Sequence, residues 1–114
     1  MLDVYRFVSI LQDELYVINQ RYKLYLNTPL GKLMLNDHLI WKILGMYNDP
    51  YVSITIERYS REFKEIIHLN KHIPIILIRS IRTSSMQEYV RALAQQIDYD
   101  FCAFEKQQGE SNEQ

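Results

Sequence analysis

The chain of 114 residues contains little glycine and little proline, three of each. Because these residues make most tight turns, we expect long elements joined by short polar links. The three glycines, Gly31, Gly45 and Gly109, also stand far apart in the sequence. A loop that cradles phosphate groups needs clustered glycines, so we do not expect a nucleotide-binding loop.

Cysteine, net charge and long apolar runs are scarce as well. The single cysteine excludes an internal disulfide. A net charge of −1 argues against a general coat for nucleic acid or membrane, which needs a basic excess. The longest apolar run, residues 75–78, is far too short to span a membrane, and the first residues lack the basic region of a secretory signal. We therefore expect a cytoplasmic protein without membrane contact.

The composition is otherwise that of a folded domain. Hydrophobic residues make up 47% of the chain and charged residues 24%, and the length is that of one domain. From residue 105 onward the sequence is polar and has no apolar anchor. We predict one globular domain over residues 1–105 and a polar, mobile tail over residues 106–114.

The first 26 residues predict a long amphipathic helix. Apolar residues recur at alternating spacings of four and three, as in a helix that faces a core. They are Val4, Val8, Leu11, Leu15, Ile18, Tyr22 and Tyr25. Flanking apolar residues widen this arc enough to contact two neighbours. Over residues 22–35 a β-hairpin is the open alternative, because residues 22–26 alternate like a strand and residues 27–31 suit a turn.

The middle of the chain is ambiguous between helix and strand. A second helix is predicted over residues 38–47, ended by Asn48, Asp49 and Pro50. Residues 51–57 alternate β-branched and polar side chains, which favours a strand, although a helix capped by Asp49 also fits. Residues 60–69 favour a helix in both cases.

Three elements are predicted after residue 72. The apolar run over residues 73–78 predicts a buried strand. Residues 85–88 have the spacing of a capping box and begin a helix over residues 85–97, and the alternation of residues 98–104 predicts a last strand. Strand, helix and strand would form a right-handed crossover unit. The expected fold class is therefore α+β, with two N-terminal helices followed by a small sheet with one or two packed helices; a mainly α, winged-helix-like fold is the alternative.

No set of side chains predicts catalysis or a metal site. His68 and His72 have the spacing of two ligands on a helix, but a site needs a third ligand and usually a fourth. Glu105 and Lys106, which a nuclease site would need on one side of a strand, would point to opposite faces. Cys102 is expected to be buried and inert, because it lies between apolar neighbours. We expect a protein that is not an enzyme and has no metal or cofactor.

Nine tyrosines are the strongest signal in the composition. A small core does not easily bury so many hydroxyl groups with partners, and tyrosine is enriched at protein interfaces. The predicted interface residues are Tyr5, Tyr16, Tyr22 and Tyr25. The broad arc of the first helix is the expected surface of a homodimer. Tyrosines that only rim the core are the alternative.

The basic middle of the chain gives a second functional hypothesis. A helix-turn-helix around residues 38–66 would bring basic residues to a DNA-binding surface: Arg58, Arg61, Lys64 and Lys71. Two features weaken it, because Trp41 is bulky for a compact two-helix motif and nearby glutamates neutralise the arginines at helical spacing. The leading hypothesis is a small non-catalytic adaptor, inhibitor or regulator that binds a protein partner. A small DNA-binding transcriptional regulator is the alternative.

Overall fold

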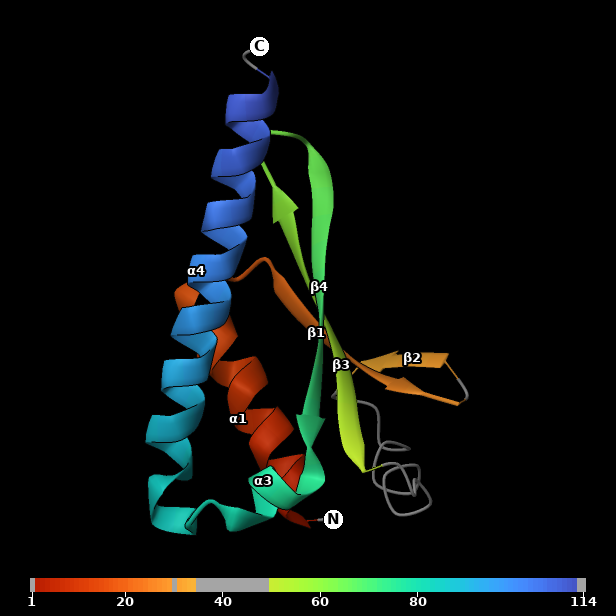
Figure 1. Ribbon diagram of the computed structural model, residues 1–114, viewed down its shortest axis with the longest axis vertical. Helices are drawn as coiled ribbons and strands as arrows, with labels where there is room; N and C mark the ends of the chain where they lie inside the picture. The colour runs from red at the N-terminus through yellow and green to blue at the C-terminus, as the bar shows by residue number, and fades with distance from the viewer. Residues whose placement is uncertain (1, 30, 35–49, 113–114) are drawn as a thin grey trace.

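The computed structural model describes residues 2–29, 31–34 and 50–112, and it has a layer of helices against one antiparallel sheet (Figure 1). Its elements in chain order are α1 (Leu2–Ile18), β1 (Tyr22–Thr28), β2 (Gly31–Met34), β3 (Tyr51–Ser60), β4 (Glu65–Pro74), α3 (Ile75–Ser80), a short 3-10 turn (Thr83–Ser85) and α4 (Met86–Asn112). The predicted mixed α+β class is confirmed. The layout differs, because in the described part of the chain one helix rather than two precedes the sheet. The helix predicted over residues 38–47 lies outside the described residues.

The first helix ends earlier than predicted, at Ile18. A polar turn follows, in which the backbone N–H of Arg21 donates to Oδ1 of Asn19 at 2.9 Å. The next residues alternate between buried and exposed positions, with Tyr22 and Leu24 buried and Lys23 exposed. The hairpin alternative is therefore the correct one for residues 22–34. Gly31 begins its second strand with a φ of 116°, a backbone conformation that favours glycine.

The sheet has the strand order β2-β1-β3-β4, and every neighbouring pair is antiparallel. The strand predicted over residues 51–57 is confirmed and extends to Ser60 as β3. Because this segment and residues 65–74 are strands, the helix-turn-helix predicted around residues 38–66 is wrong. The predicted crossover unit over residues 73–104 is also wrong, since no described strand pairs in parallel.

One face of the sheet packs against α1 and α4, which lie beside each other (Figure 1). The core between the layers consists of apolar side chains that alternate along the strands and recur every three or four residues along the helices. The sheet contributes Tyr22, Leu24, Leu26, Val52, Ile54, Ile56, Ile67 and Ile73, and the two helices contribute Val4, Phe7, Val8, Leu11, Leu15, Val90, Ala94, Ile97 and Phe101. Most of the apolar arc of α1 thus packs within the chain, against the sheet and α4, whereas Ile18 at its end is partly exposed.

The helix predicted over residues 60–69 is absent. Residues 61–64 form a turn in which Lys64 has a φ of 53°, and β4 begins at Glu65. The apolar residues Ile67 and Ile73 fall on one face of this strand, because both are odd-numbered and a strand has a period of two. Pairing with β3 along ten residues outweighs the local helix preference.

The C-terminal part of the chain is helical where strands were predicted. Pro74 ends β4 and caps α3, so the strand predicted over residues 73–78 is wrong beyond its first two residues. The helix predicted over residues 85–97 is confirmed but continues to Asn112, so the strand predicted over 98–104 is wrong and residues 106–112 are helical. Among the described residues, no helix has the length and apolar character needed to cross a membrane.

Substitution of Phe101 tests the helical assignment of residues 98–104. Phe101 is fully buried on α4, whereas Phe104 is 40% exposed. We expect Phe101→Ala to lower the free energy of unfolding by about 3–5 kcal/mol through lost burial and a cavity. Phe104→Ala, the matched control, should cost about 1 kcal/mol or less. Urea unfolding followed by circular dichroism measures both, and equal losses would contradict the placement of these two rings.

Candidate functional site

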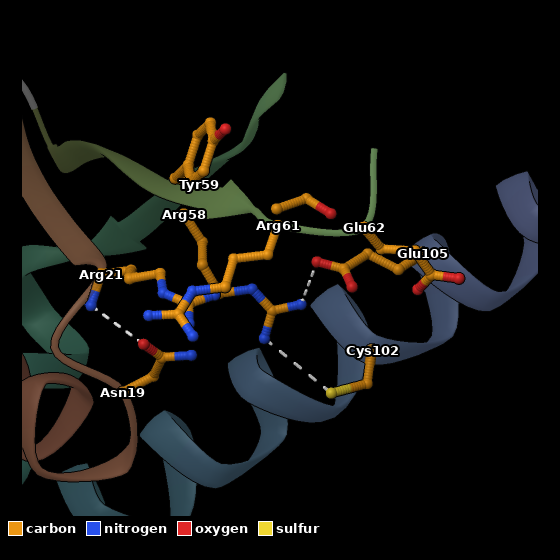
Figure 2. Close-up of a pocket in the computed structure, with 9 residues that line it drawn as sticks. Asn19, Arg21, Arg58, Tyr59, Arg61, Glu62, Cys102 and Glu105 are labelled. Carbon is orange, nitrogen blue, oxygen red and sulfur yellow. Dashed lines mark hydrogen bonds and ion pairs between the residues drawn. The ribbon is translucent and has the colours of Figure 1, made fainter. Parts of the chain in front are cut away.

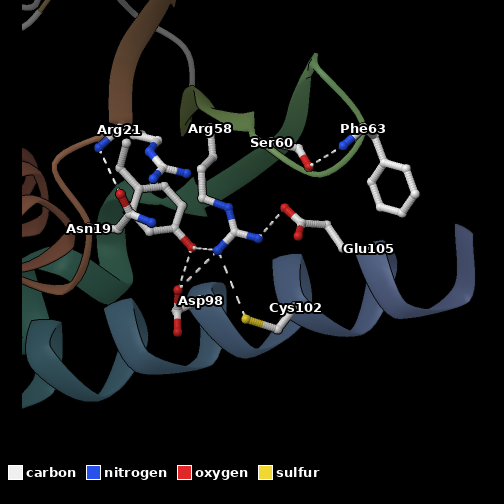
Figure 3. A network of polar contacts seen from close by, with 9 residues as sticks. Asn19, Arg21, Arg58, Ser60, Phe63, Asp98, Cys102 and Glu105 are labelled. Carbon is white, nitrogen blue, oxygen red and sulfur yellow. Dashed lines mark hydrogen bonds and ion pairs between the residues drawn. The ribbon is translucent and has the colours of Figure 1, made fainter. Parts of the chain in front are cut away.

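A buried arginine joins the sheet to α4. Arg58 follows Ile54 and Ile56 on the face of β3 that points to the helices, and its side chain is only 7% exposed. Its Nη2 donates to Oε1 of Glu105 at 2.5 Å, and its Nη1 lies 3.4 Å from Oδ1 of Asp98 and 3.9 Å from Sγ of Cys102 (Figure 3). Both acids lie on α4, two turns apart, so one guanidinium holds the strand against the helix.

Aromatic rings complete the surroundings of Arg58. The guanidinium carbon lies 5.4 Å from the ring centre of Tyr22 and 5.2 Å from that of Phe101, within the range of cation–π attraction. The hydroxyl of Tyr22 donates to Oδ1 of Asp98 at 2.6 Å and accepts from Nη1 of Arg58 at 3.1 Å. Strands β1 and β3 and helix α4 therefore meet at a single polar network.

The surroundings raise the pKa of both Arg58 and Tyr22. Burial by itself would lower the pKa of Arg58, but the hydrogen bonds to Glu105 and Cys102 raise it above its ordinary value. Burial, and then the hydrogen bond to Asp98, raise the pKa of Tyr22 far above its ordinary value. Arg58 therefore stays a cation at neutral pH, and Tyr22 stays a neutral hydrogen-bond donor.

The four basic residues predicted for nucleic-acid binding do not form one surface. Arg58 is buried and paired, so the expectation that it would be exposed is wrong. Arg61 and Lys64 are exposed in the turn between β3 and β4. Lys71 lies on the helix-facing side of β4, where its Nζ is 3.7 Å from Oδ2 of Asp100. Two of the four charges are thus paired within the chain.

The four predicted interface tyrosines also lie in different surroundings. Tyr22 is 2% exposed and belongs to the core. Tyr5 is partly buried against the core, and Tyr16 is half exposed on the same helix, α1. Tyr25 lies on the sheet face away from the helices, where burial and then the carboxylate of Glu57 raise its pKa. No common tyrosine surface follows from these positions.

The two histidines and the cysteine considered from the sequence do not form a metal-binding group among the described residues. His68 and His72 lie on a strand and not on a helix, both exposed. Among the described residues, no group of three or more His, Cys, Asp or Glu side chains has metal-binding geometry. Cys102 is exposed on α4, so the expectation that it would be buried is wrong.

The sheet face away from the helices is polar. At its centre Thr55 is fully buried, and its hydroxyl donates to Oδ1 of Asn70 at 2.7 Å and lies 3.0 Å from Oδ1 of Asn27. Asn27 Nδ2 in turn donates to Oγ of Ser53 at 3.0 Å. This side-chain network ties β1, β3 and β4 together and leaves their polar groups satisfied.

The outer side of β4 carries backbone groups that no described strand pairs. β4 is the last strand of the sheet, and it is ten residues long. Alternate residues of an antiparallel strand direct their backbone groups toward the neighbour and away from it. The N–H of Ile75 donates to the carbonyl of Pro50 at 2.9 Å, and the register continues through Ile73 opposite Val52, so the odd-numbered residues face β3. The backbone N–H and C=O groups of the even-numbered residues therefore point away from β3. These residues are Ile66, His68, Asn70 and His72.

The sequence did not predict two features of the structure, the Arg58 network and the outer edge of β4. A signal for the first was present, since Val52, Ile54, Ile56 and Arg58 alternate and place a charge on the core face of the predicted strand. Such a charge needs a buried acid. The edge of β4 could not be predicted, because residues 60–69 were expected to form a helix and not part of this strand.

Removal of Arg58 should destabilise the protein strongly. Arg58→Met keeps an unbranched, mainly apolar side chain but leaves Asp98 and Glu105 without their cation. We expect a loss of about 3–5 kcal/mol in the free energy of unfolding. Arg61→Met, in the neighbouring turn, should change it by less than about 0.5 kcal/mol. Denaturant titration at pH 7 gives both values, and a tolerated Arg58→Met would show that the network is not needed.

Alkaline pH tests the hydrogen bond of Tyr22. The unfolded chain ionises Tyr22 near its ordinary pKa of 10.0, whereas the folded chain keeps it protonated to higher pH. This contribution to stability is complete below pH 10 and is lost as pH rises above it, at about 1.4 kcal/mol per pH unit for one group. Tyr22→Phe should therefore show a shallower loss of stability between pH 9.5 and 11, measured by urea unfolding. Parallel curves for the two proteins would rule out the linkage.

Comparison with protein-family models gives no match, and no curated protein or solved structure is significantly similar to the chain. No activity, substrate or partner is therefore carried over from another protein. The free edge of β4, the polar sheet face and the charged groups around Arg58 are the features from which a function can be proposed.

Proposed function

We propose that this protein is a non-catalytic binding protein that takes up an extended segment of a protein partner along β4. The observation that carries the proposal is the outer side of this strand, which no described strand pairs, with outward backbone N–H and C=O groups at Ile66, His68, Asn70 and His72. An exposed edge of this length is a template for strand addition. The partner strand would extend the sheet and satisfy these groups.

Side chains beside the edge define what the partner would offer. The residues with outward backbone groups also place their side chains on the polar sheet face, where Ile66 lies opposite Tyr59 and both are exposed. Toward Pro74 the neighbours are His68, Asn70 and His72. A matching segment has an apolar side chain near the β3–β4 turn and hydrogen-bonding side chains farther along. Backbone hydrogen bonds would supply the affinity. The change from apolar to hydrogen-bonding side chains along the segment would set the direction in which it binds.

Self-association is part of the same proposal, but at a different surface from the one expected from the sequence. Most of the apolar arc of α1 is covered by the sheet and α4, so the outer side of β4 has more support as the surface for a second copy. The free side of β4 is a surface that a second copy could pair with in antiparallel fashion. A DNA-binding function has less support, because Arg58 and Lys71 are engaged with Asp98, Glu105 and Asp100.

Proline at an outward position tests strand addition directly. His68→Pro removes one outward N–H and leaves the pairing with β3 intact, because edge positions of this kind tolerate proline. His68→Ala removes the same side chain and keeps the N–H. Peptides selected from a displayed library on the wild-type protein should bind His68→Ala with similar affinity and His68→Pro at least about tenfold more weakly, by loss of a backbone hydrogen bond and a clash.

Light scattering of the same three proteins tests self-association through the edge. A dimer that persists in His68→Ala and dissociates in His68→Pro would assign the second copy as an occupant of β4. Thermal unfolding checks that the proline variant is folded. Selected peptides that bind all three proteins equally, or a library that yields no binder, would overturn the proposal of strand addition.

A further inference from the structure

A pocket of about 290 Å³ opens beside the Arg58 network, at the end of the sheet where β1 begins (Figure 2). β1 begins at Tyr22, which pairs with Arg58, so the last two residues of β3 extend beyond it. The turn before β1, the end of β3 and one face of α4 enclose the space. Its lining contains three arginines, Arg21, Arg58 and Arg61, and two acids, Glu62 and Glu105.

The three arginines differ in how their charge is compensated. Arg58 is held by Asp98 and Glu105 at the pocket wall. The guanidinium groups of Arg21 and Arg61 make no ion pair with any acid in the described ranges 2–29, 31–34 and 50–112. Figure 2 shows both side chains directed into the pocket, while Glu62 lies beyond Glu105 on the side away from Arg21. Two cations that no described acid pairs thus face one cavity, whose lining also contains the carboxylate of Glu62.

We propose that this pocket binds a phosphate monoester through Arg21 and Arg61. A phosphate monoester carries about −1.5 to −2 charges at pH 7, which two guanidinium groups balance, whereas a single carboxylate would leave one cation unpaired. The planar fork of donors on each guanidinium also matches phosphate oxygens in pairs. Arg58 forms the wall behind this site with its position fixed by the α4 acids, so the pocket is preformed. The site lies away from the outward side of β4 and does not depend on the proposed strand addition.

The chain contains its own reporter for this site. Cys102 lines the pocket and is the single cysteine of the sequence. Alkylation of its thiol by iodoacetamide, which is neutral, forms a carbon–sulfur bond and releases iodide and a proton. A phosphate group seated between Arg21 and Arg61 would block the approach of the reagent. The rate of alkylation, followed by mass spectrometry, therefore measures occupancy of the pocket.

The experiment compares three phosphate probes: inorganic phosphate, AMP and a short phosphoserine peptide. We expect saturable slowing of Cys102 alkylation by at least one of them. Arg21→Gln and Arg61→Gln should each weaken this protection about tenfold, the effect of one charged hydrogen-bonding partner. Protection by AMP alone assigns a small molecule, and protection by the peptide alone assigns a phosphorylated side chain of a partner. Sodium chloride at matched ionic strength controls for screening.

Arg82→Gln is the matched control variant, because it removes an exposed arginine that does not line the pocket. It should leave protection unchanged. Equal weakening by Arg82→Gln, or equal slowing by chloride, would show general charge attraction and overturn the proposal. The absence of protection by all three probes below about 10 mM would overturn it as well. Arg21, Arg61 and Arg82 lie outside the buried core, so all three glutamine variants are expected to fold. Circular dichroism verifies this.

Discussion

The positive charge of Arg58 lies between the sheet and α4, and its compensation constrains much of the structure. A cation that is almost fully removed from water needs acids and hydrogen bonds at close range. Both acids come from α4, two helical turns apart, so residues 98–105 must remain helical to bring them to the same guanidinium. Tyr22 adds β1 to the same network through its hydroxyl. The length of α4, its position over the sheet and the start of β1 are therefore linked at one point.

This linkage explains where surfaces remain open. Because β1 begins opposite Arg58, the end of β3 has no strand beside it on that side, and the turn containing Asn19 and Arg21 borders a pocket instead. On the other side of β3, the hairpin to β4 continues for its full length and ends the sheet. The late start of β1 therefore leaves room for the pocket beside the end of β3, whereas on the other side β4 is the last described strand.

The sequence predicted well those elements whose apolar period was supported by a local boundary signal. Residues 51–57, which follow Pro50, and the helix that begins after the capping box had both, whereas the α1 stripe had no signal for its end and was predicted too long. Predictions failed where tertiary pairing outweighed a local preference. Residues 65–69 are suited to a helix but pair with β3, and residues 98–104 alternate like a strand but continue α4 because Ile97 and Phe101 extend its buried stripe.

The candidate sites were harder to predict than the fold elements, for a physical reason. A basic residue is expected to be exposed unless an acid partner for it can be identified. Asp98 and Glu105 are separated from Arg58 by 40 and 47 residues, so the sequence does not identify them as its partners. Tyr22 was counted with the interface tyrosines for the same reason, although its partners Asp98 and Arg58 place it in the core. Only the alternation Ile54, Ile56, Arg58 indicated a buried charge, and it indicates no partner.

The outer edge of β4, which no described strand pairs, has two features that limit strand pairing. Long exposed edges tend to aggregate, and inward-pointing charges and proline are common protections. β4 has both, since Lys71 lies on its helix-facing side and Pro74 ends it. Lys71 is partly exposed and already paired with Asp100 of α4. A strand that adds beside Lys71 would therefore need no acid to compensate its charge. It would, however, have to leave α4 in place. Under the proposed strand addition, these two features would hinder indiscriminate pairing, whereas a segment that leaves the Lys71–Asp100 pair in place would still reach the outward groups of His68, Asn70 and His72.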